Sequence, residues 1–201
     1  MAQSLEFIFD FSSPYGYIGT LVADQIAAEF PELEVIWRPY LMGVAMKKTG
    51  LPAQVAVPIK GQYMAHDMKR TCDQMGVALV MPAQFPFMSV AVCRAFYALE
   101  SSNGQEHAQH FARTAFERCF GRGEDITDMS VLASVGAEMG ADVEAMSAAM
   151  QEQAVKDRLR AVTASVIERG CWGSPHFIVD GTEMFWGNDK RWELREYLRN
   201  A

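Results

Sequence analysis

Apolar residues in this chain of 201 residues switch between strand-like and helix-like spacing, and each switch predicts an element. Residues 5–9 form a short, mostly apolar run that predicts a buried strand. Apolar residues then recur at helical spacing, which predicts a helix that begins at Pro14 and ends before Pro31. Residues 33–37 are rich in β-branched and aromatic side chains and predict a second strand.

The middle of the chain, residues 43–170, is predicted to be almost wholly helix or loop. Glycine and proline interrupt residues 50–61, so a mobile loop is expected there, within the segment 43–61 that is expected to cover a site. Ser89 and Asp128 are expected to cap two of the helices. The expected helices cover residues 62–75, 90–99, 107–120, 128–140 and 143–169, the last as one helix or two.

Strand spacing returns near the end of the chain. Two short apolar runs flank Asp180-Gly181, a dipeptide typical of tight hairpin turns. Asn188-Asp189 is expected to cap a final helix. The two strands are predicted over residues 176–179 and 183–186, and the helix over residues 190–199.

The predicted order is β-α-β, a helical segment, and then β-β-α. This is the order of an α/β protein with a thioredoxin fold that is interrupted by an all-helical insert domain. Neither end of the chain could bury the faces of its strands alone, so the two ends are expected to meet in one sheet. The predicted domains are a thioredoxin-like domain of residues 1–42 and 171–201 and an insert domain of residues 43–170.

Charge and hydropathy argue against two kinds of partner. The formal net charge is -7, whereas a nucleic-acid surface would need clustered lysine and arginine. No apolar run approaches the roughly 20 residues that a membrane span requires. The N-terminus has no basic segment followed by an apolar one, so a cytoplasmic protein is expected.

The four cysteines lie far apart, and no pair has the Cys-x-x-Cys spacing. A zinc site or a dithiol redox centre is therefore poorly supported, and no metal is expected. A cytoplasmic setting also disfavours disulfides, so free, buried thiols are predicted. These residues are Cys72, Cys93, Cys119 and Cys171.

Ser13 has two interpretations. A serine directly before Pro14 is an ordinary helix N-cap, and on local grounds this is the more common use. A hydroxyl at the start of a helix also lies where free backbone N–H groups and the helix dipole favour an anion.

A second motif, Gly173-Ser174-Pro175, places a proline directly before a strand. Only about 5–6% of X–Pro bonds are cis, so a trans proline in a loop is the ordinary expectation. A cis bond would expose the N–H and C=O groups of Ser174 to an extended peptide, which could pair with them as a short added strand.

A third motif, Trp186-Gly187-Asn188-Asp189, follows the predicted hairpin. Asparagine or aspartate at the start of a helix is routinely a cap. The carboxylate of Asp189 could instead pair with the ammonium group of a ligand.

Taken together, the three motifs resemble the 2-hydroxychromene-2-carboxylate isomerases, which belong with the kappa-class glutathione transferases and the DsbA-like thioredoxin-fold proteins. The resemblance covers essentially the whole chain, including the position of the helical insert. It rests on Phe9-Asp10-Phe11-x-Ser13-Pro14-Tyr15, Gly173-x-Pro175, Phe185-Trp186-Gly187-Asn188-Asp189 and, for the kappa class, Lys60-Gly61-Gln62-Tyr63.

The resemblance implies that glutathione is the cofactor. Ser13 would contact its sulfur, and Ser174, before a cis Pro175, would pair through its backbone with the cysteinyl part. The γ-glutamyl end would be held by the segment Trp186, Gly187, Asn188 and Asp189.

Two positions in the insert qualify this picture. Where kappa-class transferases have an asparagine that contacts glutathione, this chain has Leu51 after Gly50. Lys47 is the nearest match to a lysine that is expected to meet substrate in the isomerases, and Lys48 and Lys60 are further candidates for a cationic partner of a substrate carboxylate.

The implied activity is cis–trans isomerisation of an unsaturated, aromatic 2-oxo acid by reversible addition of the glutathione thiolate, in a homodimer. A cysteine in place of Ser13 would give redox chemistry, and its absence argues against a disulfide oxidoreductase. Two alternatives stay open: a kappa-like glutathione transferase or peroxidase, which would consume glutathione, and a non-catalytic binding protein that uses the same groove for a peptide or partner.

Overall fold

A four-stranded mixed sheet forms the centre of the computed structural model, which describes residues 3–201. Strands follow the order β2-β1-β3-β4. β1 (Ser4–Phe9) runs parallel to β2 (Glu34–Pro39) and antiparallel to β3 (His176–Val179), which pairs with β4 (Glu183–Trp186) in a hairpin. Strands from the two ends of the chain thus meet in one sheet, as the sequence predicts.

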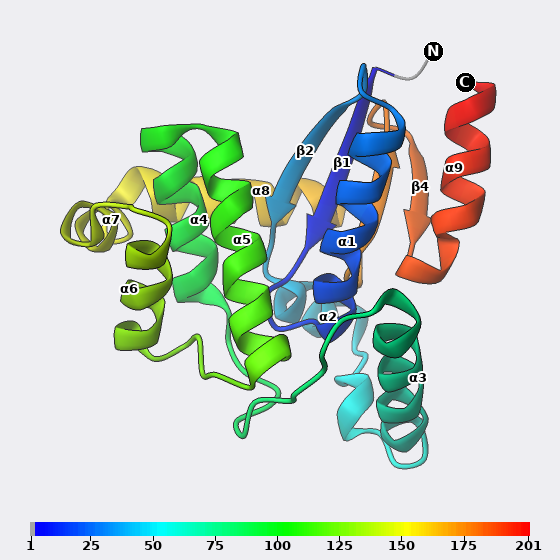
Figure 1. Cartoon of the computed structure of the whole chain (residues 1–201), viewed down its shortest axis with the longest axis horizontal. Helices are drawn as coiled ribbons and strands as arrows, with labels where there is room; N and C mark the ends of the chain where they lie inside the picture. The colour runs from blue at the N-terminus through cyan, green and yellow to red at the C-terminus, as the bar shows by residue number, and fades with distance from the viewer. Residues whose placement is uncertain (1–2) are drawn as a thin grey trace.

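Helix α1 (Pro14–Glu29) crosses the front of the sheet in Figure 1, and α9 (Arg191–Asn200) lies beside β4. Helices α4 to α7 gather at the β2 side, α2 and α3 lie below the lower end of the sheet in this view, and α8 passes behind the strands (Figure 1). The helices of this segment are α2 (Met42–Thr49), α3 (Lys60–Met75), α4 (Val90–Asn103), α5 (Gln105–Phe116), α6 (Met129–Glu138), α7 (Val143–Ala149) and α8 (Gln153–Glu168).

The face of the sheet that α1 covers is aromatic. Phe7 on β1 lies 4.9 Å from Trp37 and 5.3 Å from Phe177 on the two neighbouring strands, measured between ring centroids. α1 approaches this face so closely that a Cβ atom on Gly19 would lie 2.8 Å from the Phe7 ring. Because only glycine fits there, the close packing fixes the position of α1 and therefore of its N-terminus.

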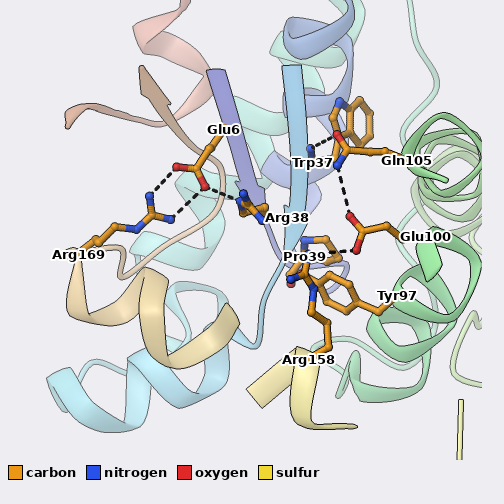
Figure 2. Close-up of polar contacts among 9 residues, drawn as sticks. All are labelled: Glu6, Trp37, Arg38, Pro39, Tyr97, Glu100, Gln105, Arg158 and Arg169. Carbon is orange, nitrogen blue, oxygen red and sulfur yellow. Dashed lines mark hydrogen bonds and ion pairs between the residues drawn. The ribbon is translucent and has the colours of Figure 1, made fainter. Parts of the chain in front are cut away.

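The opposite face carries an ion network. Glu6 on β1 is paired with Arg38 on the neighbouring strand and with Arg169 just after α8, and Figure 2 shows both guanidinium groups turned toward the carboxylate. Burial by itself would raise the pKa of Glu6, but the hydrogen bonds and charges of Arg169 and Arg38 lower it below its ordinary value. The network joins the end of α8 to the centre of the sheet.

Two glutamine side chains cover the open edge of β2. The Trp37 N–H donates to Gln105, 3.3 Å away, and Gln109 donates to the carbonyl of Val35 at 3.2 Å (the first contact is visible in Figure 2). Gln105 and Gln109 are four residues apart on α5 and therefore lie on one face of that helix. These side chains take the place of hydrogen-bond partners from a neighbouring strand. Without them, the edge of β2 would be free to pair with strands of other chains.

Several predicted boundaries in the helical segment are wrong. The helix expected over residues 107–120 ends at Phe116 and continues as a π-helical turn, Glu117–Gly121. The loop expected over residues 50–61 contains a 3₁₀ helix, Gln54–Ala56, and the first two residues of α3, Lys60 and Gly61. Residues 143–169 form two helices, which is one of the two arrangements expected. The helix expected over residues 90–99 extends to Asn103, because Gly104 rather than a residue near Leu99 provides the break.

The predicted caps are correct at some positions and wrong at others. Asp128 accepts a hydrogen bond from the Ser130 N–H and caps α6. Ser89 precedes α4 but makes no capping bond, because its side chain interacts with the carboxylate of Asp10. Asn188 and Asp189 do not cap α9, since they form a 3₁₀ turn, Asn188–Lys190, ahead of it.

All four cysteines are free and buried, as predicted, and burial raises the pKa of every thiol. The division into two domains stays a prediction, and the buried side chains of both parts form one continuous core. Among residues 3–201, no helix combines the length and the apolar character that crossing a membrane would take.

Candidate functional site

The three sequence motifs meet at one end of the sheet, where β1 and β2 end and α1 begins (Figure 1). The hydroxyl of Ser13 lies 3.1 Å from the carbonyl oxygen of Ser174, a residue 161 positions away in the chain. The N–H of Gly187 donates to the carbonyl of Pro175 at 2.9 Å. The fold therefore brings together the site residues predicted from both ends of the sequence.

Ser13 is the N-cap of α1, with extended backbone angles and Pro14 as the first helical residue. Its Oγ accepts a hydrogen bond from the Gly16 N–H at 3.1 Å and donates its own hydrogen to Ser174. The side chain is buried, with the residue 5% exposed. Both interpretations of Ser13 are thus compatible, because the capping bond uses only a lone pair and leaves the hydroxyl proton available to turn.

The loop before β3 is held firmly against the start of α1. The Asp10 N–H donates to the Ser174 hydroxyl at 3.0 Å, and the Ser174–Pro175 peptide bond is cis. A Cβ atom on Gly16 would lie 3.1 Å from the Ser174 Oγ, so the first turn of α1 and this loop are in close contact. The Ser174 backbone is therefore placed beside the Ser13 hydroxyl by contacts on both sides.

The segment after β4 forms the next wall. The ring of Trp186 packs on Trp172 with centroids 4.0 Å apart, and Gly187 has a left-handed φ of +99°. A Cβ atom on Gly187 would lie 2.3 Å from the Asp189 carboxylate, so that carboxylate folds back over a position only glycine can occupy. Asn188 is buried, whereas Asp189 is exposed and available to a ligand.

Asp10 is a buried hub that sequence analysis overlooked. Its carboxylate accepts from the N–H and hydroxyl of Ser12, at 2.8 and 2.9 Å, and from the N–H of Met42 at 2.7 Å. Burial raises its pKa above the ordinary value, although the contacts from Ser89, Ser12 and Met42 act in the opposite direction. Asp10 thus ties the loop before α1 to the start of α2 and to Ser89.

Tyr15, for which the sequence motif predicts no role, links α1 to α3. Its hydroxyl donates to Asp67 on α3 at 2.9 Å, and Arg70 binds the other oxygen of that carboxylate. Burial first, and the bond to Asp67 second, raise the pKa of Tyr15 well above its ordinary value. The nearby charge of Asp189 adds to this effect, so Tyr15 lies between α3 and the segment after β4.

The candidate lysines lie farther out. Lys47 and Lys48 occupy the last turn of α2, and Lys60 begins α3. All three are exposed and make no ion pair within residues 3–201. Asp10 anchors Met42 at the start of α2. Lys47 lies about 8 Å farther along that helix than Met42, at about 1.5 Å per residue. Leu51 is also exposed and places an apolar side chain where the resemblance leads one to expect an amide.

His176, the first residue of β3, is buried beside the site, and Trp172 and Trp186 lie near its ring. Its Nδ1 atom lies 3.0 Å from the Gly173 carbonyl, which fixes the tautomer as the one that carries hydrogen on Nδ1. Burial lowers its pKa to about 4, so the ring is neutral at neutral pH.

This lowered pKa predicts an acid-sensitive stability. The unfolded chain binds a proton at His176 below about pH 6.5, whereas the folded chain does so only near pH 4. The contribution of His176 therefore falls by up to about 1.4 kcal/mol per pH unit as the pH drops through this window. We expect His176→Asn, followed by urea unfolding at several pH values, to flatten the curve there; an unchanged slope would contradict the assignment.

The site offers the groups that bind a small peptide thiol. The Ser174 backbone N–H makes no hydrogen bond within residues 3–201, the Ser13 hydroxyl lies beside it at a helix N-terminus, and Asp189 supplies an exposed carboxylate. These groups fit the peptide backbone, the sulfur and the ammonium group of glutathione, respectively. Over the same residues no cluster of His, Cys, Asp or Glu could hold a metal ion.

Known proteins of this architecture are close in sequence as well as in fold. A family model described as a DSBA-like thioredoxin domain matches residues 4–199. A 2-hydroxychromene-2-carboxylate isomerase of Sphingobium xenophagum is 30% identical over 200 residues, which cover 98% of this chain and 99% of the relative. Glutathione S-transferase kappa 1 of Rattus norvegicus is 28% identical over 204 residues, with coverage of 96% and 89%. A solved 2-hydroxychromene-2-carboxylate isomerase structure has a TM-score of 0.88 at 25% identity and covers 98% of this chain and 95% of its own.

Proposed function

The chain belongs to the DSBA-like thioredoxin domain family, and we propose that it is a glutathione-dependent cis–trans isomerase of an unsaturated, aromatic 2-oxo acid. Its relatives over nearly the whole sequence are isomerases and glutathione transferases, so the chain is an enzyme, and the resemblance stated from its motifs is confirmed. The finer assignment rests on the site.

One observation carries the proposal: a serine hydroxyl, not a thiol, stands at the N-terminus of α1 beside the Ser174 backbone. In redox members of this architecture a Cys-x-x-Cys motif opens such a helix, whereas this chain has Ser13 to Gly16 there. All four cysteines are buried elsewhere with raised thiol pKa values, so none can replace that motif. In the proposed reaction the reactive sulfur would therefore come from a bound thiol.

The chain's own residues would prepare that thiol. An unperturbed thiol has a pKa of about 8.5 and is mostly protonated at neutral pH. The Gly16 N–H polarises the Ser13 hydroxyl, whose proton can turn from the Ser174 carbonyl toward a sulfur bound beside the hydroxyl. Together with the positive end of α1, this donor favours the thiolate.

When bound, glutathione would supply a thiolate whose addition turns a double bond of the substrate into a single bond that can rotate. Because the addition is reversible, no glutathione is consumed. The Ser174 N–H would hold the cysteinyl part, and Trp186, Gly187, Asn188 and Asp189 would hold the γ-glutamyl end. Lys47 and Lys60 would attract the substrate carboxylate from α2 and the start of α3. We extend the proposal to a cytoplasmic homodimer.

Calorimetric titration tests the cofactor assignment. We expect reduced glutathione to bind. S-methyl glutathione should bind at least about tenfold more weakly, because methylation removes the thiolate that Ser13 favours. Equal binding of both would place the sulfur away from Ser13. No binding of either would overturn the proposed function.

Measurement of glutathione consumption distinguishes the proposed isomerase from a glutathione transferase. The named relatives include a glutathione S-transferase, which makes net conjugation the alternative outcome. Free thiol is measured before and after complete turnover of a cis-configured aromatic 2-oxo acid. An isomerase leaves the thiol concentration unchanged, whereas its loss in proportion to product would show a transferase.

A further inference from the structure

Two buried side chains converge on one backbone oxygen directly before Ser174. The hydroxyl of Tyr40 donates to the carbonyl of Gly173 at 2.7 Å, and Nδ1 of His176 lies 3.0 Å from the same oxygen. Both side chains are fully buried. They come from different parts of the sheet, since Tyr40 follows β2 and His176 begins β3.

The contact with the Gly173 oxygen also fixes the direction of the Ser174 N–H, because the two groups belong to one planar peptide. The peptide bond between Gly173 and Ser174 is trans, so its C=O and N–H groups point in opposite directions. With the Gly173 oxygen held by Tyr40 and His176, the Ser174 N–H must point away from them. Within residues 3–201 that N–H makes no hydrogen bond, although the Ser174 side chain and carbonyl are both bonded.

The arrangement carries more polar groups than packing alone would require. Among residues 3–201 the buried Nε2 atom of His176 has no hydrogen-bond partner, which is unfavourable in a protein interior. One donor would already satisfy the Gly173 carbonyl, yet two rigid rings share it. Two donors on one oxygen restrict the rotation of that peptide plane more than either alone.

We propose that Tyr40 and His176 are positioning residues that hold the Ser174 N–H toward the cysteinyl carbonyl of a bound γ-glutamyl-cysteinyl thiol. This inference rests on the proposed function and deepens it. It separates two tasks in one site: Ser13 acts on the sulfur, whereas Tyr40 and His176 orient the donor that places the peptide. Loss of either positioning residue should weaken binding without changing the ionisation of the bound thiol.

The test compares conservative variants by calorimetry with glutathione. Tyr40→Phe removes only one hydroxyl and His176→Leu removes the ring donor; each is expected to weaken binding about tenfold. His176→Asn offers an amide donor near the position of Nδ1 and is expected to restore most of the affinity. Tyr97→Phe is the matched control, because the buried Tyr97 hydroxyl also donates to a backbone carbonyl, but to that of Pro39 at the end of β2 and not to the loop before β3.

A second readout separates positioning from general loosening. In the wild-type protein we expect the NMR signal of the Ser174 amide proton to move downfield when glutathione is added, and to move much less in Tyr40→Phe. The pKa of the bound thiol should be the same in both proteins. If the wild type binds but Tyr40→Phe and His176→Leu bind within about twofold of it, or if Tyr97→Phe is equally impaired, the inference is wrong while the proposed function stands. If the wild type does not bind glutathione, both are wrong.

Discussion

Replacing Ser13 with alanine is expected to raise the pKa of the bound glutathione thiol by up to about two units, equivalent to up to about 2.7 kcal/mol. At neutral pH this should lower kcat/KM by up to roughly 25-fold, because the thiolate fraction at a pKa of about 6.5 is roughly 25 times that at a pKa of about 8.5. The reason is local: the variant removes the hydroxyl that the Gly16 N–H polarises, while the dipole of α1 remains. The measurement is a pH titration of thiolate absorbance in the complex, paired with a pH–rate profile.

Two variants separate this effect from the loss of a helix cap. Asp128→Ala removes the cap of α6, far along the chain from the site, and should lower the free energy of unfolding without changing the bound thiol. Ser13→Thr keeps a hydroxyl and should retain most of the shift. If Ser13→Ala lowers stability as Asp128→Ala does but leaves the thiol pKa unchanged, Ser13 is a structural cap and nothing more.

Replacing Asp10 with alanine is expected to lower the free energy of unfolding by about 3 kcal/mol, a large share of the stability of a typical domain. The change leaves the Ser12 N–H and the Met42 N–H without their acceptor at a buried position. It also releases the start of α2, so the candidate lysine on that helix, Lys47, should contribute less to substrate binding. Urea unfolding gives the first effect and KM for the 2-oxo acid gives the second.

The chain contains a matched control for Asp10. Asp125 accepts from the N–H and the hydroxyl of Thr127, the same local pattern that Asp10 makes with Ser12, but it has no partner on α2. Asp125→Ala should therefore cost about 1 kcal/mol and leave KM unchanged. A loss of similar size in both variants would show that the link from Asp10 to Met42 contributes little.

Local sequence patterns predicted the elements and the three motifs well because each depends on neighbouring residues. Ser13 before Pro14 caps α1, and Asp180-Gly181 turns the hairpin with both residues at positive φ, as their chemistry predicts. The errors lie where tertiary contacts decide. Ser89 is at a helix start but interacts with Asp10 instead of capping, and Asn188 and Asp189 form a separate turn.

The supporting layer of the site could not be read from the sequence. Asp10 and Tyr15 stand in the motif, but their partners Met42 and Asp67 are 32 and 52 residues away. Tyr40 and His176 meet at Gly173 only because the sheet brings β2 and β3 to the same end. Contacts over such separations follow from the fold, so a single sequence supplies no periodicity or spacing that would reveal them.

We propose that this enzyme binds glutathione as a thiolate beside Ser13. The most direct test of this proposal is the pH titration of thiolate absorbance for glutathione bound to the wild-type protein, with free glutathione as the reference. We predict a bound thiol pKa about two units below that of the free thiol. A bound thiol that titrates at the same pH as free glutathione would contradict the claim.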